Sequence, residues 1–280
     1  MTTPCAIVTR PEHEALAWVA ALEQRGIAAL ALPLIGIGPA PDAPALQAAR
    51  QRLTDYRAIM LVSGNAAQQF FEPNTALALM GRALAAIKTD IPDIRTRVWS
   101  PGPGTAQTLQ RLGIPAALID CPAADAVQFD SESLWEQVRS QITPGDRVLI
   151  VRGGEADAPA HGSGREWLAQ QIKAAGGEVD FVVAYTRSAP QFTPAQIAQA
   201  QAAADNGAVW LLSSSQALGN LCAALAGQDW RRARALATHP RITEAARAAG
   251  FGAVYECRPA LQDVATALES LCQAAQRSAS

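Results

Sequence analysis

Hydroxyl side chains follow short apolar runs at four places in the chain, and they are the first candidates for chemistry. Ser63, Thr105, Ser213 and Thr243 each stand where an apolar run gives way to a helical pattern. At such junctions in α/β proteins the helix N-terminus offers unpaired N–H groups and a positive dipole end, which bind anions. Ser and Thr are also preferred there as N-caps for stability alone. Both interpretations stay open, and four such positions facing one cleft would favour binding.

Other chemistries lack the residues that they need. The three histidines, His13, His161 and His239, are far apart and have no partners at helical spacing, so the sequence predicts no metal site. The five cysteines are scattered and form no C-x-x-C pair, which favours thiols over a disulfide framework. The stretch Gly102–Thr105 resembles a phosphate loop but lacks the lysine that would reach a terminal phosphate. Nucleotide chemistry is therefore disfavoured.

The length and charge of the chain limit its class. Its 280 residues exceed a usual domain of roughly 100 to 150 residues, which predicts two domains. The 23 basic and 25 acidic residues give a net charge of −2, which argues against a protein that coats nucleic acid by bulk charge. The sequence shows no pattern of an export signal and no apolar stretch suited to a bilayer. We expect a cytoplasmic protein with no membrane and no nucleic-acid partner.

Short apolar runs alternate with helical patterns, which predicts α/β layers with mostly parallel strands flanked by helices. The predicted helix at Glu12–Arg25 carries Leu16, Val19 and Leu22 on one face and stops at Gly26, a favoured residue after a helix. The predicted strands are Ala6–Thr9, Ala28–Leu34, Ala58–Ser63, Val98–Ser100, Ala117–Ile119, Val148–Val151, Val179–Tyr185, Val209–Ser213, Ala235–Ala237 and Ala253–Tyr255.

The chain also repeats itself. Val148–Arg152 echoes Ala6–Arg10, and Ala208–Ser213 echoes Ala58–Ser63. Val98–Ala106 is echoed more loosely by Leu236–Thr243. The echoes keep their order and are spaced by roughly 140 to 150 residues, which predicts two similar α/β domains.

Nine short pieces occur in order over almost the whole chain. They are Val8–Pro11, Leu32–Ile35, Ser63–Ala66, Gly102–Ala106, Ser131–Leu134, Arg152–Gly153 with Gly164–Glu166, Tyr185–Arg187, Ser213–Ser215, and Ala245–Arg247 with Gly250–Phe251. Each piece alone is weak, because small residues after strands are common in α/β proteins. In their order and spacing together, the pieces resemble the uroporphyrinogen-III synthase family.

The resemblance implies two α/β domains joined by a two-stranded connection, with the first domain discontinuous. We expect residues 1–36 and 188–280 in one domain and 40–180 in the other. The connection is expected at 33–39 and 181–190. Domains joined by a thin connection are expected to hinge on a ligand.

The resemblance also implies an activity. Members of the family cyclise the linear tetrapyrrole hydroxymethylbilane to uroporphyrinogen III, with inversion of the last ring (ring D) and loss of water, and they use no cofactor. The enzyme's main task is positioning, because spontaneous closure gives the uninverted isomer. The resemblance further suggests a monomer and a possible transient hand-over of substrate from hydroxymethylbilane synthase.

Residue roles follow from the resemblance in the same way. Tyr185 matches a family tyrosine near the reacting end and is the candidate proton donor to the leaving hydroxyl, the alternative being a packed ring with its hydroxyl bonded elsewhere. Arg10, Arg152 and Arg165 are candidates for carboxylate contacts, the alternative being ordinary ion pairs. The remaining residues expected to bind substrate are Ser63, Asn65, Gly102, Thr105, Ser213, Ser214 and Thr243.

The stretch Gly153–Ser163 departs from the family, because it is longer than the usual glycine-rich turn. As a polar loop residue in that stretch, His161 is expected to face solvent. Two other classes of protein remain open. A non-catalytic two-domain protein that binds a small anion shares the repeat and the helix N-termini. A nucleotide-sugar or phosphoryl transferase would need metal-binding acids or a lysine-bearing loop, and neither is evident.

Overall fold

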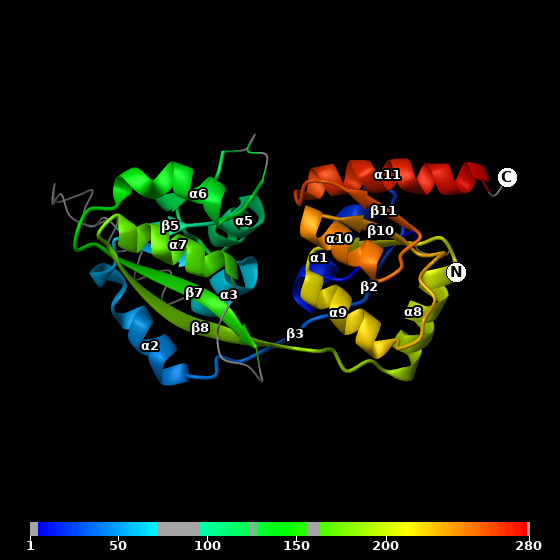
Figure 1. Cartoon of the computed structure of the whole chain (residues 1–280), viewed down its shortest axis with the longest axis horizontal. Helices are drawn as coiled ribbons and strands as arrows, with labels where there is room; N and C mark the ends of the chain where they lie inside the picture. Colours follow the sequence, from blue (N-terminus) through cyan, green and yellow to red (C-terminus); the bar gives the residue numbers. More distant parts are fainter. Residues whose placement is uncertain (1–4, 72–95, 124–125, 127, 156–162, 279–280) are drawn as a thin grey trace. The chain divides into compact units, whose positions relative to one another are not determined.

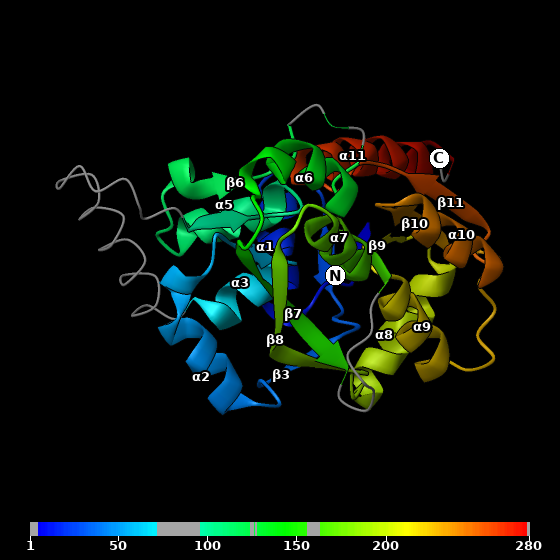
Figure 2. The same cartoon turned by 60° about the vertical axis from the view of Figure 1, so that its left-hand side comes forward.

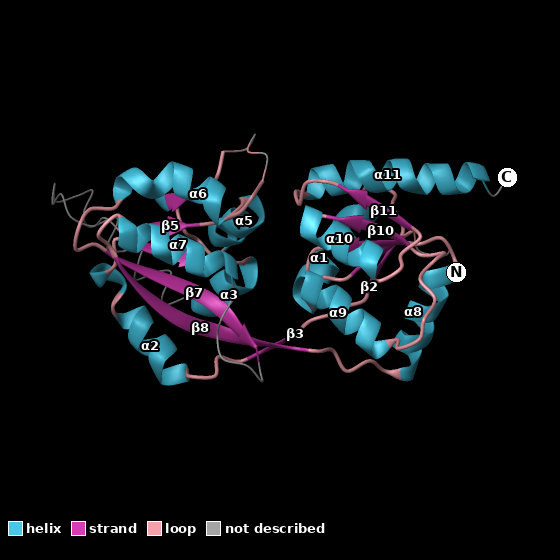
Figure 3. Cartoon of the chain, in the orientation of Figure 1, coloured by secondary structure: helices cyan, strands magenta, loops and turns pink. Residues whose placement is uncertain are grey.

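The computed structural model describes residues 5–71, 96–123, 126, 128–155 and 163–278 (Figure 1). Contacts between Cα atoms divide the chain into two compact units. Unit 1 comprises Met1–Ile37 and Ser188–Ser280, and unit 2 comprises Gly38–Arg187. Each unit holds one sheet with helices packed on it, so the predicted α/β class is confirmed (Figure 3). No helix of the described residues is long and apolar enough to cross a membrane.

Unit 1 contains a five-stranded sheet in the order β11-β10-β9-β1-β2, and all four pairings are parallel. Its strands are β1 (Ala6–Val8), β2 (Ala29–Ala31), β9 (Val209–Leu212), β10 (Arg234–Ala237) and β11 (Ala253–Glu256). Its helices are α1 (Glu12–Glu23), α8 (Pro194–Asp205), α9 (Ser215–Ala224), α10 (Pro240–Ala248) and α11 (Leu261–Ser278). Parallel strands buried on both faces read as continuous apolar runs, as these do.

Alternate residues of these strands feed two separate cores. Ile7 and Trp210 pack with residues of α8, α9 and α10 on one face of the sheet. Val8 and Leu211 pack with residues of α1 and α11 on the other face. This division follows from the two-residue period of a strand. Both faces of the sheet are therefore covered by apolar cores, and polar residues lie at the ends of the strands.

Unit 2 contains a six-stranded sheet in the order β3-β8-β7-β4-β5-β6, in which β8, β7, β4, β5 and β6 pair in parallel. The strands of this sheet are β3 (Gly36–Gly38), β4 (Ala58–Leu61), β5 (Arg97–Trp99), β6 (Ile119–Asp120), β7 (Arg147–Glu155) and β8 (Glu178–Ser188). The start of β3 and the last residue of β8 fall in unit 1, because the chain passes between the units within these two strands. The helices of unit 2 are α2 (Ala43–Gln51), α3 (Gly64–Phe70), α5 (Pro103–Arg111), α6 (Ser131–Val138) and α7 (Ser163–Ala174), with short 3-10 turns η1 (Leu53–Asp55), η2 (Ala116–Leu118) and η3 (Arg139–Gln141).

Strands β7 and β8 are much longer than the other strands of this sheet, with nine and eleven residues (Figure 2). The part of the sheet in which β4, β5 and β7 lie side by side packs on residues of α6 and α7 through Met60, Trp99 and Ile150. Beyond Leu61, where β4 ends, β7 and β8 continue side by side. The short strand β3 borders β8 in the sheet.

Two expected strands differ from the structure. The run Ala28–Leu34 is a strand only at Ala29–Ala31, because Pro33 has no N–H to donate and interrupts the ladder. The chain then enters the other sheet as β3. The run Ala117–Ile119 is mostly a 3-10 turn at Ala116–Leu118 that follows Pro115, and β6 begins only at Ile119.

Candidate functional site

Tyr185, near the carboxyl end of β8, reaches across β7 to the end of β4. Its phenol oxygen lies 3.1 Å from Ser63 Oγ, and the residue is only 4% exposed. As the N-cap of α3, Ser63 also accepts the N–H of Ala66 at 3.1 Å. Because Ser63 keeps its own proton while accepting that N–H, it can donate to Tyr185 and leave the phenol proton for another acceptor. The phenol of Tyr185 is therefore a candidate general acid, and its hydrogen bond with Ser63 fixes its orientation.

Two features of β7 and β8 make room for this ring. The parallel register shifts by one residue, so that Arg152 faces Val183 whereas Gly153 faces Tyr185. A Cβ on Gly153 would lie 2.5 Å from Cζ of Tyr185 and 2.8 Å from its hydroxyl oxygen. Contacts under 3.0 Å essentially never occur for a real Cβ, so glycine at 153 is what lets the ring lie over β7.

Arg152 lies one residue before this glycine. Its half-buried guanidinium makes no hydrogen bond or ion pair with a described residue. Its guanidinium carbon lies 4.7 Å from the centre of the Phe181 ring. Burial lowers the pKa of Arg152, and the charge of Glu166 partly offsets that effect. Arg165 lies in the first turn of α7 with its side chain outside the described part of the structure, and His161 lies wholly outside it.

The second polar strand end of unit 2 precedes α5. Gly102 is the N-cap of this helix and Pro103 its first residue. The buried Ser100 donates its hydroxyl to the carbonyl of Gly102 at 2.7 Å, which fixes this turn. Thr105 is buried in the first turn, and its hydroxyl has no hydrogen bond to a described residue. Asn65 is buried at the second position of α3.

In unit 1 the corresponding strand ends hold the other predicted residues. Arg10 follows β1, pairs with Glu14 at 3.1 Å and lies 4.1 Å from the centre of the Trp18 ring. Ser214 is the N-cap of α9 and accepts the N–H of Ala217 at 3.4 Å. Ser213 is half-buried and has no hydrogen bond to a described residue.

Thr243 is buried in the first turn of α10 and already has an acidic partner. Its hydroxyl donates to Oε2 of Glu256, at the end of β11, over 2.9 Å. The N-cap of α10 is His239, whose Nδ1 accepts the N–H of Arg241 at 3.1 Å. Any carboxylate that binds Thr243 must therefore compete with Glu256. No sequence pattern singles out Glu256, because the pairing depends on the two elements being packed together.

The N-cap interpretation of the four hydroxyls is correct for one of them. Ser63 caps α3, whereas the cap of α9 is Ser214 and not Ser213. Thr105 and Thr243 lie inside the first turns of helices capped by Gly102 and His239. Helix stability alone thus explains Ser63 and Ser214, and it does not explain the choice of residue at Thr105 or Ser213.

The described residues contain no group of three or more His, Cys, Asp or Glu side chains that could hold a metal ion. Cys121, Cys222 and Cys257 are free thiols, and burial raises the pKa of each. Cys5 is disulfide-bonded, which corrects the expectation of a thiol there. Sequence spacing could not reveal that bond, because it depends on which Cβ atoms the fold brings together.

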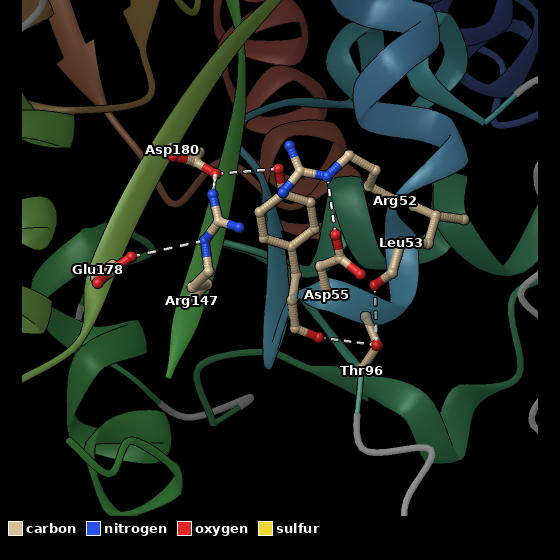
Figure 4. A network of polar contacts seen from close by, with 8 residues as sticks. Arg52, Leu53, Asp55, Thr96, Arg147, Glu178 and Asp180 are labelled. Atoms are coloured by element: carbon tan, nitrogen blue, oxygen red, sulfur yellow. Dashed lines mark hydrogen bonds and ion pairs between the residues drawn. The ribbon is translucent and has the colours of Figure 1, made fainter. Parts of the chain in front are cut away.

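A polar pocket of about 320 Å³ lies in unit 2 at the amino ends of β4 and β7, opposite to the strand ends described above. Figure 4 shows its network, in which Arg147 approaches Asp180 at 2.6 Å and Glu178 at 3.7 Å. The hydroxyl of Tyr56 donates to Asp180 at 3.1 Å, and burial raises the pKa of this phenol.

The rest of the network is equally self-contained. Arg52 pairs with Asp55 at 2.8 Å, and Thr96 donates to the carbonyls of Leu53 and Tyr56 (Figure 4). Each carboxylate of this network already has a guanidinium or phenol partner. The network therefore consists of contacts between residues near the amino ends of the strands.

Comparison with known proteins places the chain among its relatives. A sequence profile described as uroporphyrinogen-III synthase HemD matches residues 17–264. The uroporphyrinogen-III synthase of Chlorobaculum parvum is 29% identical over 153 residues, which cover 52% of this chain and 52% of that protein. That of Synechococcus elongatus is 27% identical over 229 residues, which cover 80% of this chain and 76% of the relative. The first match thus spans about half the length of the relative.

Among solved structures, a mutant uroporphyrinogen III synthase from the extremely thermophilic bacterium Thermus thermophilus has the same fold. The TM-score is 0.51 at 16% sequence identity, and the alignment covers 97% of this chain and 99% of the other. At this identity the likeness concerns the fold alone.

Proposed function

Because the chain belongs to the uroporphyrinogen-III synthase family, we propose that it closes hydroxymethylbilane to uroporphyrinogen III, with inversion of the last ring and loss of water. The family profile matches residues 17–264, so it takes in the strand ends that carry Ser63, Ser213 and Thr243 and leaves out the end of β1, where Arg10 lies. The observation that carries the proposal at the level of residues is the contact of Tyr185 with Ser63.

The reaction requires a proton donor and a binding site that fixes the conformation of the substrate. In this proposal the phenol of Tyr185 gives its proton to the terminal hydroxyl of the substrate, which leaves as water and produces an electrophilic azafulvene. The last pyrrole then attacks through its substituted ring position and forms a spiro intermediate. Because spontaneous closure gives the uninverted isomer, the protein must favour that attack by holding the linear chain folded.

The substrate carries eight carboxylates, which suits the polar strand ends of both units. In unit 2 the proposed contacts are Ser63, Asn65, Gly102, Thr105, Arg152 and Arg165. In unit 1 they are Arg10, Ser213, Ser214 and Thr243. Backbone N–H groups at the starts of α5, α9 and α10 can supply further donors without any net positive charge on the protein.

The proposed contact residues differ in whether their polar groups already have a hydrogen-bond or ion-pair partner among the described residues. Arg10 is already paired with Glu14, and Thr243 with Glu256, so each must give up a partner to bind substrate. Arg152, Thr105 and Ser213 give up no hydrogen bond to a described residue. We expect the second group to contribute more to substrate affinity, because binding costs them no hydrogen bond or ion pair with a described residue.

No residue set that could hold a metal is present in the described ranges, and the proposed chemistry uses none. Since the substrate closes spontaneously to the wrong isomer, transient hand-over from hydroxymethylbilane synthase would protect it. Both this hand-over and a cytoplasmic location stay predictions.

The test is to supply freshly generated hydroxymethylbilane to the purified, metal-stripped protein and to separate the oxidised products by isomer with HPLC. Mostly type III product is expected. Only type I product, as in a reaction without protein, would refute the proposal and favour a non-catalytic protein that binds an anion. Adding Tyr185→Phe, with the exposed Tyr255→Phe as a matched control, then tests the proton donor.

A further inference from the structure

Almost every half-buried arginine among the described residues has an oxygen acceptor for its guanidinium. Arg97 pairs with Asp120 at 2.6 Å, Arg187 with Glu155 at 2.6 Å, and Arg147 with Asp180 at 2.6 Å. Others use carbonyls, as Arg234 does with Leu271 at 2.8 Å. This pattern is expected, because a guanidinium taken from water loses hydration that only acceptors replace.

Arg152 is the exception in the described part of the chain. Among those residues no carboxylate lies within 4.0 Å of it, its guanidinium makes no hydrogen bond, and its Nε is buried without a partner. Its guanidinium carbon lies 4.7 Å from the centre of the Phe181 ring, a cation–π contact. Burial lowers the pKa of Arg152, as expected for a cation that has lost water and gained no bonded anion.

The aromatic contact holds this cation without using its donors. A guanidinium over a ring is attracted through the ring face. Nε of Arg152 is buried, so the N–H groups that stay available to a ligand are those of the two terminal nitrogens, Nη1 and Nη2. Arg152 thus keeps the planar fork that grips a carboxylate through two parallel hydrogen bonds. Phe181 is 40% exposed, one of the few large apolar side chains of the described residues that face solvent, so apolar surface remains beside the fork.

We infer that Arg152 and Phe181 form a subsite for a carboxylate attached to an aromatic ring. Arg152 binds the carboxylate, and Phe181 packs beside it. The identity of the ligand rests on the proposed function. With that function, the carboxylate belongs to an acetate or propionate side chain on one pyrrole of the substrate. Phe181 is here a positioning residue, because it acts on the carboxylate through the orientation of Arg152.

The sheet connects this subsite to the proposed proton donor. Arg152 and Gly153 are consecutive in β7, and the register shift between them places Val183 beside the first and Tyr185 beside the second. Side chains of consecutive strand residues point to opposite faces, so binding at Arg152 leaves the ring of Tyr185 undisturbed. Loss of the subsite is therefore expected to change substrate affinity and to leave the proton transfer intact.

The test compares Arg152→Ala, Arg152→Lys and Phe181→Leu with Arg139→Ala, which removes an exposed arginine from the same unit. The first readout is KM against kcat for hydroxymethylbilane. The second is equilibrium binding of uroporphyrin III, a non-reacting octacarboxylate, measured by quenching of tryptophan fluorescence at several salt concentrations. Circular dichroism confirms that each variant is folded.

Arg152→Ala is expected to raise KM and the Kd of uroporphyrin III roughly tenfold, as for loss of a charged hydrogen-bonded pair, with kcat changed by less than about twofold. Arg152→Lys recovers part of the affinity, since it keeps the charge and loses the fork. Phe181→Leu gives an intermediate loss, and Arg139→Ala behaves as the unaltered protein.

Unchanged KM and Kd in Arg152→Ala, or an equal loss in Arg139→Ala, would overturn the subsite. If the unaltered protein makes no type III product while uroporphyrin III binding still depends on Arg152, the proposed function fails and the subsite stands. If type III product forms and neither readout depends on Arg152, the function stands and the subsite fails.

Discussion

At the scale of single residues, Tyr185 is the group on which the proposed chemistry depends. Its phenol has one polar contact among the described residues, Ser63 Oγ at 3.1 Å. Tyr185→Phe removes the proton and keeps the buried ring, so we expect kcat for type III product to fall about 100-fold, in the range for loss of a general acid. KM should change little, because the ring still fills its place.

The sharpest comparison is with Arg10→Ala, measured in single turnovers. Arg10 is already bound to Glu14, so its loss is expected to slow the chemical step less than Tyr185→Phe does. Equal or reversed effects would remove Tyr185 from the role of acid. Ser63→Ala should give a smaller loss than Tyr185→Phe, since it frees the phenol without removing it.

Gly153→Ala tests the positioning of the same ring. The added methyl would meet three atoms of Tyr185 at 2.5 to 2.8 Å, so the ring or the strand must shift. Either shift is expected to alter the 3.1 Å contact of Tyr185 with Ser63. We expect a loss of about 1 to 3 kcal/mol in the free energy of unfolding and a fall in kcat beyond what that loss explains.

Tyrosine-labelled NMR can follow this movement directly, because the chain has only three tyrosines. The Tyr185 signal should shift in Gly153→Ala, whereas those of Tyr56 and Tyr255 should not. Gly219→Ala is the matched control, since a Cβ there meets nothing within 4 Å. An unshifted Tyr185 signal in Gly153→Ala would contradict the steric argument.

At the scale of elements, the segment from β11 to α11 predicts how stability depends on pH. Burial, with help from Asp263 and Glu256, raises the pKa of the Cys257 thiol from 9.0 to about 12. The unfolded chain therefore releases this proton near pH 9 while the folded chain keeps it. The stability that the protonated thiol contributes is complete below pH 9 and is lost as the pH rises toward 12.

The measurement is thermal unfolding of the protein and of Cys257→Ala between pH 8 and pH 10.5. Between these values the Tm of the unaltered protein should fall more than that of the variant. Cys121 and Cys222 are present in both proteins, so their own raised pKa values cancel in the comparison. Parallel curves would show that Cys257 titrates alike in the folded and unfolded chains.

Elements were easier to predict from the sequence than the contacts between them. The apolar runs at Ala58 and Val209 begin β4 and β9, because parallel strands buried on both faces leave an unbroken apolar signature. Pro33 shortened one predicted strand, Ala28–Leu34, to Ala29–Ala31, since its missing N–H acts locally against the apolar pattern.

The contact of Ser63 with Tyr185 was beyond sequence reasoning for a different reason. The two residues are 122 positions apart, and a one-residue register shift between β7 and β8 decides which side chain meets β4. Register depends on how whole strands pair, which no local pattern records. The family resemblance placed both residues in the site and did not predict their contact. A local sign is the pair Gly153–Gly154 soon after an apolar run, where glycine marks a close approach.

At the scale of the whole molecule, the two units differ in how the chain builds them. Unit 2 is a single stretch, Gly38–Arg187, whereas unit 1 is assembled from both ends of the chain. Unit 2 has its own core, formed by β4, β5 and β7 with α6 and α7, and its polar network near the amino ends of the strands is internal to the unit. A contiguous unit with a separate core has what it needs to fold alone.

We therefore expect a fragment of residues 36–188, which keeps β3 beside β8, to fold and to unfold cooperatively in urea. It contains Ser63, Gly153 and Tyr185, so its Tyr185 NMR signal should match that of the full chain. It lacks Ser213, Ser214 and Thr243, and for this reason it should give only type I product from hydroxymethylbilane. A folded fragment that still makes type III product would mean that unit 1 supplies no essential contact, and an unfolded fragment would mean that unit 2 depends on unit 1 for its stability.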